Sequence, residues 1–528
     1  MSSSRSRGTI AVVALVLLGA AGALGFVGWS KLARQEPLHF ADPAEQFKYG
    51  PIGNMDAQGM PYYVWLVLPR VFREYVPGNG GYAAFGFKSE PAHEVPVGLA
   101  RQTIGFPRVS FNCAICHSAS FRTSADAAPT IAPGGPGHTQ DTQAYLQFLF
   151  ACASDARFTA DVLMPEIEQN VHLSLIDELL YRHVLIPATR KALLQQKQAN
   201  AWMATRPRWG PGRIDPFNPV KIGLLGMKVD DTIGNADNMS IWSMKSRVGQ
   251  RLHWDGMNDT IHEVVLTSAL GDGATLKSIP LADLKVLEAF LMDVQPPRYP
   301  GPVDAALAER GKTVFTRLCQ DCHGEGGKIT GKVVRFDEIG TDPERHRLWG
   351  QEAADRYNAY AEAYPFDFDH WVATNGPEGG YSSTPLTGIW LRAPYLHNGS
   401  VPSLVDLFAE PYGDDLPVEV TSLATSLAAL PPTELRKHTD ELRVVEEHVK
   451  AARAAGRRPA LYFRGLDLVD FEHVGFVSDR SSLGEEPQPF LYDTRLPGNG
   501  QRGHVGERYG TTLPAEEKSA LIEYLKTL

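Results

Sequence analysis

The sequence predicts a mainly α-helical protein with two similar halves, preceded by a single transmembrane helix. Two observations predict the halves. The pentapeptide Cys113-Ala-Ile-Cys116-His117 recurs as Cys319-Gln-Asp-Cys322-His323, and each half closes with a similar helical pattern. The third observation is a long uncharged run near the N-terminus, which predicts the membrane helix.

The uncharged run extends from Thr9 to Trp29 and has basic residues on both sides. Its 21 residues would reach about 31 Å as a helix, enough to cross the hydrocarbon core of a bilayer. The small residues 21–23 also fit a signal-peptide cleavage site. We expect residues 1–35 to be a single-pass anchor in the bacterial inner membrane with the body in the periplasm, or a signal whose removal gives a secreted protein.

Each Cys-x-x-Cys-His motif predicts one covalently attached c-type haem, so two haems are expected. Two thiols one helical turn apart can bond to the vinyl groups on one edge of a porphyrin, and the histidine that follows can bind the iron. A zinc site would need four ligands close together, whereas the two pairs lie about 200 residues apart. The predicted attachment residues are Cys113, Cys116, Cys319 and Cys322, with His117 and His323 as iron ligands. The remaining cysteine, Cys152, is assigned no role.

The two expected domains are cytochrome c-like and cover residues 36–295 and 303–528. The proline-rich segment Pro296–Pro302 is typical of a linker between them. Pro280–Leu291 and Pro514–Leu525 share apolar residues at the i, i+3, i+4 spacing of one helix face, so both are predicted closing helices.

Each half is expected to carry a large loop-rich insertion, at residues 122–211 and 409–497. The segment His39–Pro107 is rich in glycine, proline and aromatics and is predicted to be loop-dominated. Helix starts are predicted at Thr260 and Ser403, because each hydroxyl residue is followed three positions later by an acid.

The second iron is predicted to take His504 as its distal ligand. No methionine follows Met292, although a methionine from the loop before the last helix is the usual sixth ligand in small c-type cytochromes. That loop instead contains Gly503-His504, which predicts bis-histidine ligation and a lower potential than a histidine–methionine pair gives. His397 and Tyr395 are the alternatives, and His397 could instead bond to a haem propionate.

The first iron is predicted to keep an open coordination position. Ten residues before Pro514 is His504, but ten before Pro280 is Leu270, and the expected loop Val264–Thr275 has no histidine, methionine, lysine, tyrosine or cysteine. An open site with apolar walls can bind dioxygen or peroxide. Other residues that could fill the position are Met164, Met203, Met239, Met244, Met257 and His262.

This asymmetry predicts a division of labour, with chemistry at the first haem and electron transfer at the second. Trp242 and Trp254 fall in the turn region that should face the interior, where either could lie between the two rings. The net charge of −10 without a basic cluster argues against nucleic-acid binding, and an acidic surface suits a basic redox partner.

The chain resembles the bacterial dihaem cytochrome c peroxidase superfamily, which includes the dihaem enzymes that mature a tryptophan-derived cofactor. The resemblance covers roughly Val109 to Leu528 and is closest to the dihaem rubber-oxygenase branch. The segments that carry it are Arg251-Leu-His-Trp-Asp-Gly256, Ala393–Leu404 (APYLHNGSVPSL), Phe111–His117, Gly210–Phe217, Pro385–Trp390 and Gly503-His504.

The resemblance implies an oxygenase that binds dioxygen at the first iron and splits a carbon–carbon double bond in a hydrophobic, unsaturated substrate. Peroxidases of this family use an acidic residue beside the first haem, and here the corresponding loop offers only Asp272, outside the family's usual motif. The second-haem methionine of the peroxidases is also missing. A dihaem peroxidase and a non-enzymatic periplasmic electron carrier are the alternative functions.

Overall fold

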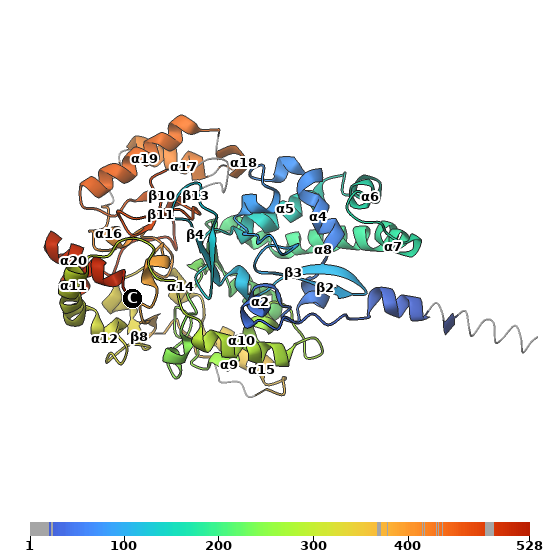
Figure 1. The fold of residues 1–528 in the computed structure, drawn as a ribbon, viewed down its shortest axis with the longest axis horizontal. Helices are drawn as coiled ribbons and strands as arrows, with labels where there is room; N and C mark the ends of the chain where they lie inside the picture. The colour runs from blue at the N-terminus through green and yellow to red at the C-terminus, as the bar shows by residue number, and fades with distance from the viewer. Residues whose placement is uncertain are drawn as a thin grey trace, which may run out of the picture.

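The computed structural model describes residues 21–22, 25–366, 371–376, 378–413, 416, 418–428, 430, 432–435, 437–480 and 490–528. It is 44% helical and also contains several small sheets. Helices α11 (Ala305–Leu318) and α20 (Ala515–Leu525) lie at one end of the molecule, and α4 (Tyr62–Val71) and α8 (Ile186–Ala199) lie at the other, with β4 (Ser118–Phe121) between them (Figure 1).

The other helices divide between the two halves. The first half contains α2 (Pro43–Tyr49), α3 (Met55–Gln58), α5 (Thr142–Ser154), α6 (Ala160–Glu168), α7 (Leu175–Leu180), α9 (Ile261–Gly271) and α10 (Leu281–Asp293). The second contains α12 (Gln320–His323), α13 (Phe336–Ile339), α14 (Glu344–Arg347), α15 (Gln351–Ala361), α16 (Leu404–Leu407), α17 (Val418–Ala428), α18 (Pro432–Leu435) and α19 (Thr439–Ala454).

The strands form one three-stranded sheet, in the order β1-β3-β2, and several two-stranded antiparallel pairs. In the first half they are β1 (Met60–Pro61), β2 (Leu99–Ile104), β3 (Phe106–Phe111), β5 (Thr130–Pro133), β6 (Arg213–Ile214) and β7 (Ala236–Asp237). In the second they are β8 (Val333–Arg335), β9 (Gly380–Ser382), β10 (Leu461–Arg464), β11 (Val469–Asp470), β12 (Gly475–Phe476) and β13 (Phe490–Asp493).

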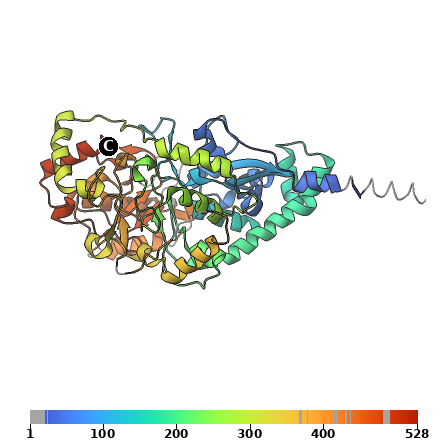
Figure 2. The same ribbon diagram turned by 90° about the horizontal axis from the view of Figure 1, so that it is seen from below.

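The predicted N-terminal transmembrane helix is not supported, which corrects the predicted fold class. Among the described residues, no helix has both the length and the apolar character that a membrane crossing requires. Most of the run from Thr9 to Trp29 lies outside the described residues. The helical residues 25–32 project from one end of the molecule, where Lys31 pairs with Asp177 of α7 at 2.7 Å (Figure 2).

The predicted closing helices are confirmed. They are α10 and α20, and Pro280 and Pro514 stand at their N-caps rather than inside the first turn. The helix starts are also confirmed, because Thr260 and Ser403 are the N-caps of α9 and α16. Only the Ser403 side chain accepts a backbone hydrogen bond, from the amide of Asp406.

Two segments predicted as loops are largely regular structure. The segment 39–107 forms three helices and most of the three-stranded sheet, and its aromatic residues, such as Phe47 and Trp65, are buried core residues. The aromatic residues of this segment therefore pack in the hydrophobic core and do not mark loops. In the predicted loop Val264–Thr275, residues 264–271 continue α9, because nothing in that apolar run interrupts a helix before Gly273 (φ 98°).

The hydrophobic cores combine residues from both halves of the sequence. The core around α11 and α20 includes Phe121 of β4 and Trp242 from the first half, packed with Trp390 and Leu521 from the second. Phe121 and Trp390 make an edge-to-face contact with ring centres 5.1 Å apart. The two halves therefore share a continuous interior.

The helices α11 and α20 cross at a glycine. A Cβ atom added at Gly311 would lie 1.8 Å from the carbonyl oxygen of Ala520, so only glycine permits this approach. A backbone atom cannot move aside as a side-chain end can, and a methyl group here would separate the two helices.

We therefore expect Gly311→Ala to lower the free energy of unfolding by about 1–3 kcal/mol, in spite of the higher helix propensity of alanine. Thermal unfolding of the haem-loaded protein measures the effect. Gly223→Ala is the matched control, because nothing lies within 4 Å of a Cβ at that position. Equal midpoints for the two variants would contradict the close crossing.

Candidate haem sites

The two Cys-x-x-Cys-His motifs fold in the same way. In each, the histidine amide donates to the carbonyl of the first cysteine, at 3.1 Å for His117 and 2.8 Å for His323. The turn brings the two thiols of each motif to one side of the chain. This local geometry is the one that attachment of both thiols to a single porphyrin edge requires.

Both motif histidines are oriented by a backbone carbonyl. His117 Nδ1 lies 2.8 Å from the carbonyl oxygen of Met239, and His323 Nδ1 lies 2.8 Å from that of Thr384. A carbonyl can only accept, so Nδ1 carries the proton and Nε2 keeps a free lone pair. Burial lowers the pKa of both imidazoles, which favours the neutral form that binds a metal.

His504 faces His323 across the second site. Their ring centres are 6.3 Å apart. Two imidazole nitrogens on opposite sides of one metal ion would be about 4 Å apart, at about 2 Å per bond, and each ring centre lies about 1 Å farther out. The separation is therefore compatible with one iron between them. Burial lowers the pKa of His504 to about 3, so its ring is neutral.

The loop that carries His504 is fixed from behind by a buried guanidinium. Arg458 donates to four carbonyl oxygens, those of Gln501 (2.6 Å), Leu407 (2.9 Å), Gly503 (3.0 Å) and His504 (3.2 Å). His504 itself adopts a left-handed backbone conformation, with φ 51°. Such a conformation is costly for a residue with a side chain and persists only where the surroundings hold it.

The two alternative ligands have other contacts. The hydroxyl of Tyr395 donates to the carbonyl of Ile389 at 3.1 Å, and burial raises its pKa far above the ordinary value, which disfavours a phenolate ligand. His397 is buried, and its ring stacks on Tyr381 with centres 4.0 Å apart. Both residues line the cavity at the second motif without facing His323 as His504 does.

A cavity surrounds the second motif and fits a haem. Both motif thiols and both histidines border it, and its apolar wall includes Leu404 and Phe408. Soft thiols, neutral imidazoles and apolar side chains are the groups that a c-type haem requires. The first half contributes Trp242 and Trp254 to the same wall.

The segment 237–242 lies between the two motifs. The carbonyl of Met239 orients His117 of the first motif, and Met239 also lines the cavity of the second. Trp254 donates from Nε1 to the carbonyl of Asp237 at 2.7 Å, and Trp242 donates to Pro133 at 2.8 Å. Both tryptophans therefore belong to the wall of the second cavity, and their place between two haems stays a prediction.

Buried ion pairs join the halves beside this wall. Asp237 lies 2.9 Å from Arg464, and Asp255 lies 3.2 Å from Arg345. Each pair combines a first-half carboxylate with a second-half guanidinium, and loss of one partner would leave a buried charge. Sequence reasoning missed these partners, because only the fold brings residues so far apart in the chain together.

The first motif lies close to Asp272. Its charge raises the pKa of both Cys113 and Cys116, after the larger effect of burial. Asp272 is an exposed residue, and the protein atoms packed around its carboxyl raise its pKa to about 6. Leu270, which stands at the position equivalent to His504, is buried in the first-half core at the end of α9.

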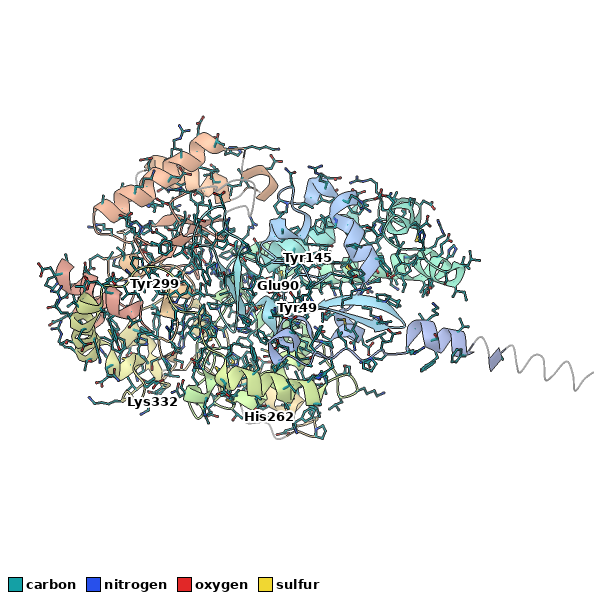
Figure 3. All side chains as sticks on the ribbon, viewed as in Figure 1. Tyr49, Glu90, Tyr145, His262, Tyr299 and Lys332 are labelled. Carbon is teal, nitrogen blue, oxygen red and sulfur yellow. The ribbon has the colours of Figure 1, made fainter. Side chains whose placement is uncertain are left out.

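Several alternative ligands for the first iron have other surroundings. His262 is on the outer face of α9, where its Nδ1 lies 2.8 Å from a carboxylate oxygen of Glu288 (Figure 3). Met203 packs with tryptophans in a separate small cluster, and Met257 packs in the cluster around Trp349. The other three methionines lie in the region of the first motif. Met164 and Met244 belong to the large first-half core that also includes the motif cysteines, and Met239 lies beside His117.

One further group of ionisable side chains has the spacing of a metal site. Glu45, Glu90 and His93 lie within reach of one another, and Tyr49 and Glu90 lie close together near the centre of the molecule (Figure 3). Lys48 already pairs with both carboxylates, at 2.6 Å and 2.5 Å. The lysine charge supplies the cation that the two acids need, so the group is a structural ion-pair network.

Residues 380–411 match the profile of the RoxA-like, cytochrome c-like family. This match indicates a c-type haem and a haem-containing oxidoreductase. The uncharacterized protein y4iM of Sinorhizobium fredii is 26% identical over 331 residues, 55% of this chain and 64% of the relative. The uncharacterized protein y4iJ of the same organism is 25% identical over 296 residues, 44% of this chain and 41% of the relative. The chain thus spans less than two thirds of either relative.

We expect His504→Ala to convert one low-spin haem centre to high spin, because the variant removes the imidazole that faces His323. Electron paramagnetic resonance of the oxidised protein measures the change, and added imidazole should restore the low-spin signal. His397→Ala is the matched control, since it also removes a buried histidine from the cavity wall. A low-spin signal that disappears only in the control would assign the ligand to His397.

Proposed function

We propose that the protein is an exported dihaem c-type cytochrome oxidoreductase of the rubber-oxygenase type. The first site, at His117, would bind dioxygen or peroxide, and the second, at His323 and His504, would relay electrons. The observation that carries the proposal is the asymmetry of the two sites. A neutral imidazole faces His323, whereas Leu270 stands at the equivalent sequence position in the first half.

A c-type haem supplies a reversible one-electron centre when both axial positions are filled, and a binding site for dioxygen or peroxide when one is free. The residues of this chain would determine whether each iron has both axial positions filled or one free. The carbonyls of Met239 and Thr384 orient the two motif histidines in the same way, so the proposed difference between the sites would come from the opposite side of each ring. The apolar first-half core would keep water away from the first site.

Trp254 and Trp242 belong to the proposed route between the sites. Both line the second cavity, and both are anchored through their ring N–H to backbone carbonyls. An anchored ring keeps a constant distance to its neighbours, which suits electron transfer. The acidic net charge of −10 supports docking of a basic redox partner protein.

Export follows from the proposed cofactor, because bacteria attach c-type haems outside the cytoplasm. We therefore place the working protein in the periplasm or outside the cell. The proposed substrates are dioxygen and a hydrophobic unsaturated compound, in line with the family match and with the apolar first-half core. A nucleic-acid ligand is not part of the proposal.

A peroxidase function is the second candidate, and Asp272 favours it. The carboxyl lies near the first motif, and its pKa of about 6 gives it both protonation states near neutral pH. A group with this property can accept a proton from hydrogen peroxide and return it to the departing oxygen. The position of Asp272 outside the family's usual motif weighs against this role.

We expect the oxidised protein to show one high-spin and one low-spin haem centre in its electron paramagnetic resonance spectrum. An open axial position would leave the first iron with a weak field, while two imidazoles would give the second a strong one. Mass spectrometry of the intact protein checks that both haems are attached. Two low-spin centres would instead indicate an electron carrier without a catalytic site.

The oxygenase is expected to consume dioxygen with an unsaturated isoprenoid hydrocarbon in the absence of peroxide. Isotopically labelled dioxygen should leave both of its atoms in the cleavage products. If the protein is a peroxidase, turnover should need peroxide and should increase as pH rises through about 6, where Asp272 ionises to become a base. Asp272→Asn would then abolish that pH dependence. The control is Asp283→Asn, which removes a different carboxylate, on α10, and should leave the pH dependence in place.

A further inference from the structure

Two arginines on the wall of the second cavity have no carboxylate partner among the described residues. Arg247 belongs to the first half, just before the Trp254 turn, and Arg392 belongs to the second. Both border the cavity together with His323. Neither makes an ion pair in the part of the chain that the structure describes, although Arg247 is only 6% exposed.

The hydrogen bonds of the two guanidinium groups are incomplete. Arg247 donates from one terminal nitrogen to the carbonyl of Arg251 at 3.0 Å, and its Nε is buried without a partner. Arg392 donates to the carbonyls of Pro385 and Thr387, and its Nε is also buried without a partner. A carbonyl satisfies a donor but carries no net charge, so both cations remain uncompensated.

The two cations also act on each other. The charge of Arg247 lowers the pKa of Arg392, which is about 9, after the larger effect of burial. The pKa of Arg247 is lowered to about 10 by burial alone. Like charges side by side in a buried wall are unfavourable unless an anion lies between them or beside them.

Three other buried arginines of this protein each have a carboxylate partner. Arg464 has Asp237, Arg345 has Asp255, and Arg453 has Asp406 at 2.9 Å. Arg458, which has no such carboxylate in the described part of the chain, donates to four carbonyl oxygens instead. Arg247 and Arg392 have fewer acceptors, and both border the cavity. The cavity is therefore the place from which a counter-charge would reach both guanidinium groups.

We propose that Arg247 and Arg392 bind the propionate groups of the haem attached to Cys319 and Cys322. The inference rests on the proposed function, because it requires a haem at the second motif. A haem carries two carboxylates on one edge, which match two neighbouring cations in number, charge and hydrogen-bonding geometry. The loop that holds Arg392 also contains Thr384, whose carbonyl orients His323, so one segment would position both the ligand and the propionates.

The proposal gives the first half a direct part in holding the second haem. Arg247 lies on the first-half side of the linker, in the turn region that precedes Trp254. It would increase the potential of the second haem, because a nearby cation favours the reduced iron, which carries one positive charge less. Its contact would also fix the orientation of the ring relative to the Trp254 wall.

The test compares Arg247→Gln, Arg392→Gln and Arg247→Lys with the wild-type protein. The readouts are the propionate-bending band in the resonance Raman spectrum of the low-spin haem and the reduction potential of that haem. We expect both glutamine variants to shift the band and lower the potential. Arg247→Lys should shift the band but retain most of the potential, because it keeps the charge and loses the planar fork.

Arg122→Gln is the matched control. It removes a mostly buried arginine that lies 2.7 Å from Asp467, and Lys88 remains beside that carboxylate. The control should leave the band and the potential unchanged. An unchanged band and potential in Arg247→Gln, with both haems attached by mass spectrometry, would overturn the propionate assignment, even if Arg392→Gln fails to fold.

Two further outcomes separate this proposal from the proposed function. Changes confined to the high-spin haem would overturn the assignment to the second site while the dihaem function stands. A wild-type protein without haem on Cys319 and Cys322 would overturn the proposed function and this inference with it. Intact-protein mass spectrometry of each variant distinguishes these cases before any spectrum is interpreted.

Discussion

The hydrogen bond between the His117 ring and the carbonyl of Met239 links the two sites of this molecule. It fixes the tautomer and orientation of the first motif histidine, and it does so through the segment that also walls the cavity of the second motif. A shift of that segment would change both sites together. The shared hydrophobic core and the buried pair of Asp237 with Arg464 hold the segment in place. The two sites therefore share one wall segment and one hydrophobic core.

The buried arginines of this protein have different kinds of partner. The protein buries several guanidinium groups, and two of them, Arg464 and Arg345, pair with carboxylates from the other half of the chain. Arg458 is satisfied by four carbonyls, whereas Arg247 and Arg392 face the second cavity without an anion. The proposed haem is an anionic molecule with apolar faces, and both properties would suit this wall. Placement of the two Arg side chains is a stronger guide to the orientation of that molecule than the attachment motif alone.

Local sequence predicted the elements whose signals are local. The turns of both motifs, the closing helices α10 and α20 and the helix starts at Thr260 and Ser403 depend on neighbouring residues, and all could be found from spacing. The predicted transmembrane helix is not supported, because no helix among the described residues is both long enough and apolar enough to span a bilayer. The loop assignment of 39–107 failed because glycine, proline and aromatic residues occur in packed cores as well as in loops. The carbonyls that orient His117 and His323 lie 122 and 61 positions away, and a backbone acceptor has no signature in the sequence.

The four carbonyls around Arg458 also bear on the speed of electron transfer. They hold the backbone of Gln501, Gly503 and His504 to the segment at Leu407, so the ring of His504 is supported from a side that does not face His323. A ligand held in this way would move little when the iron gains or loses an electron. The reorganisation energy of the second centre would then be small, and its rate of exchange would be governed by distance to its neighbours and not by rearrangement of its own coordination shell.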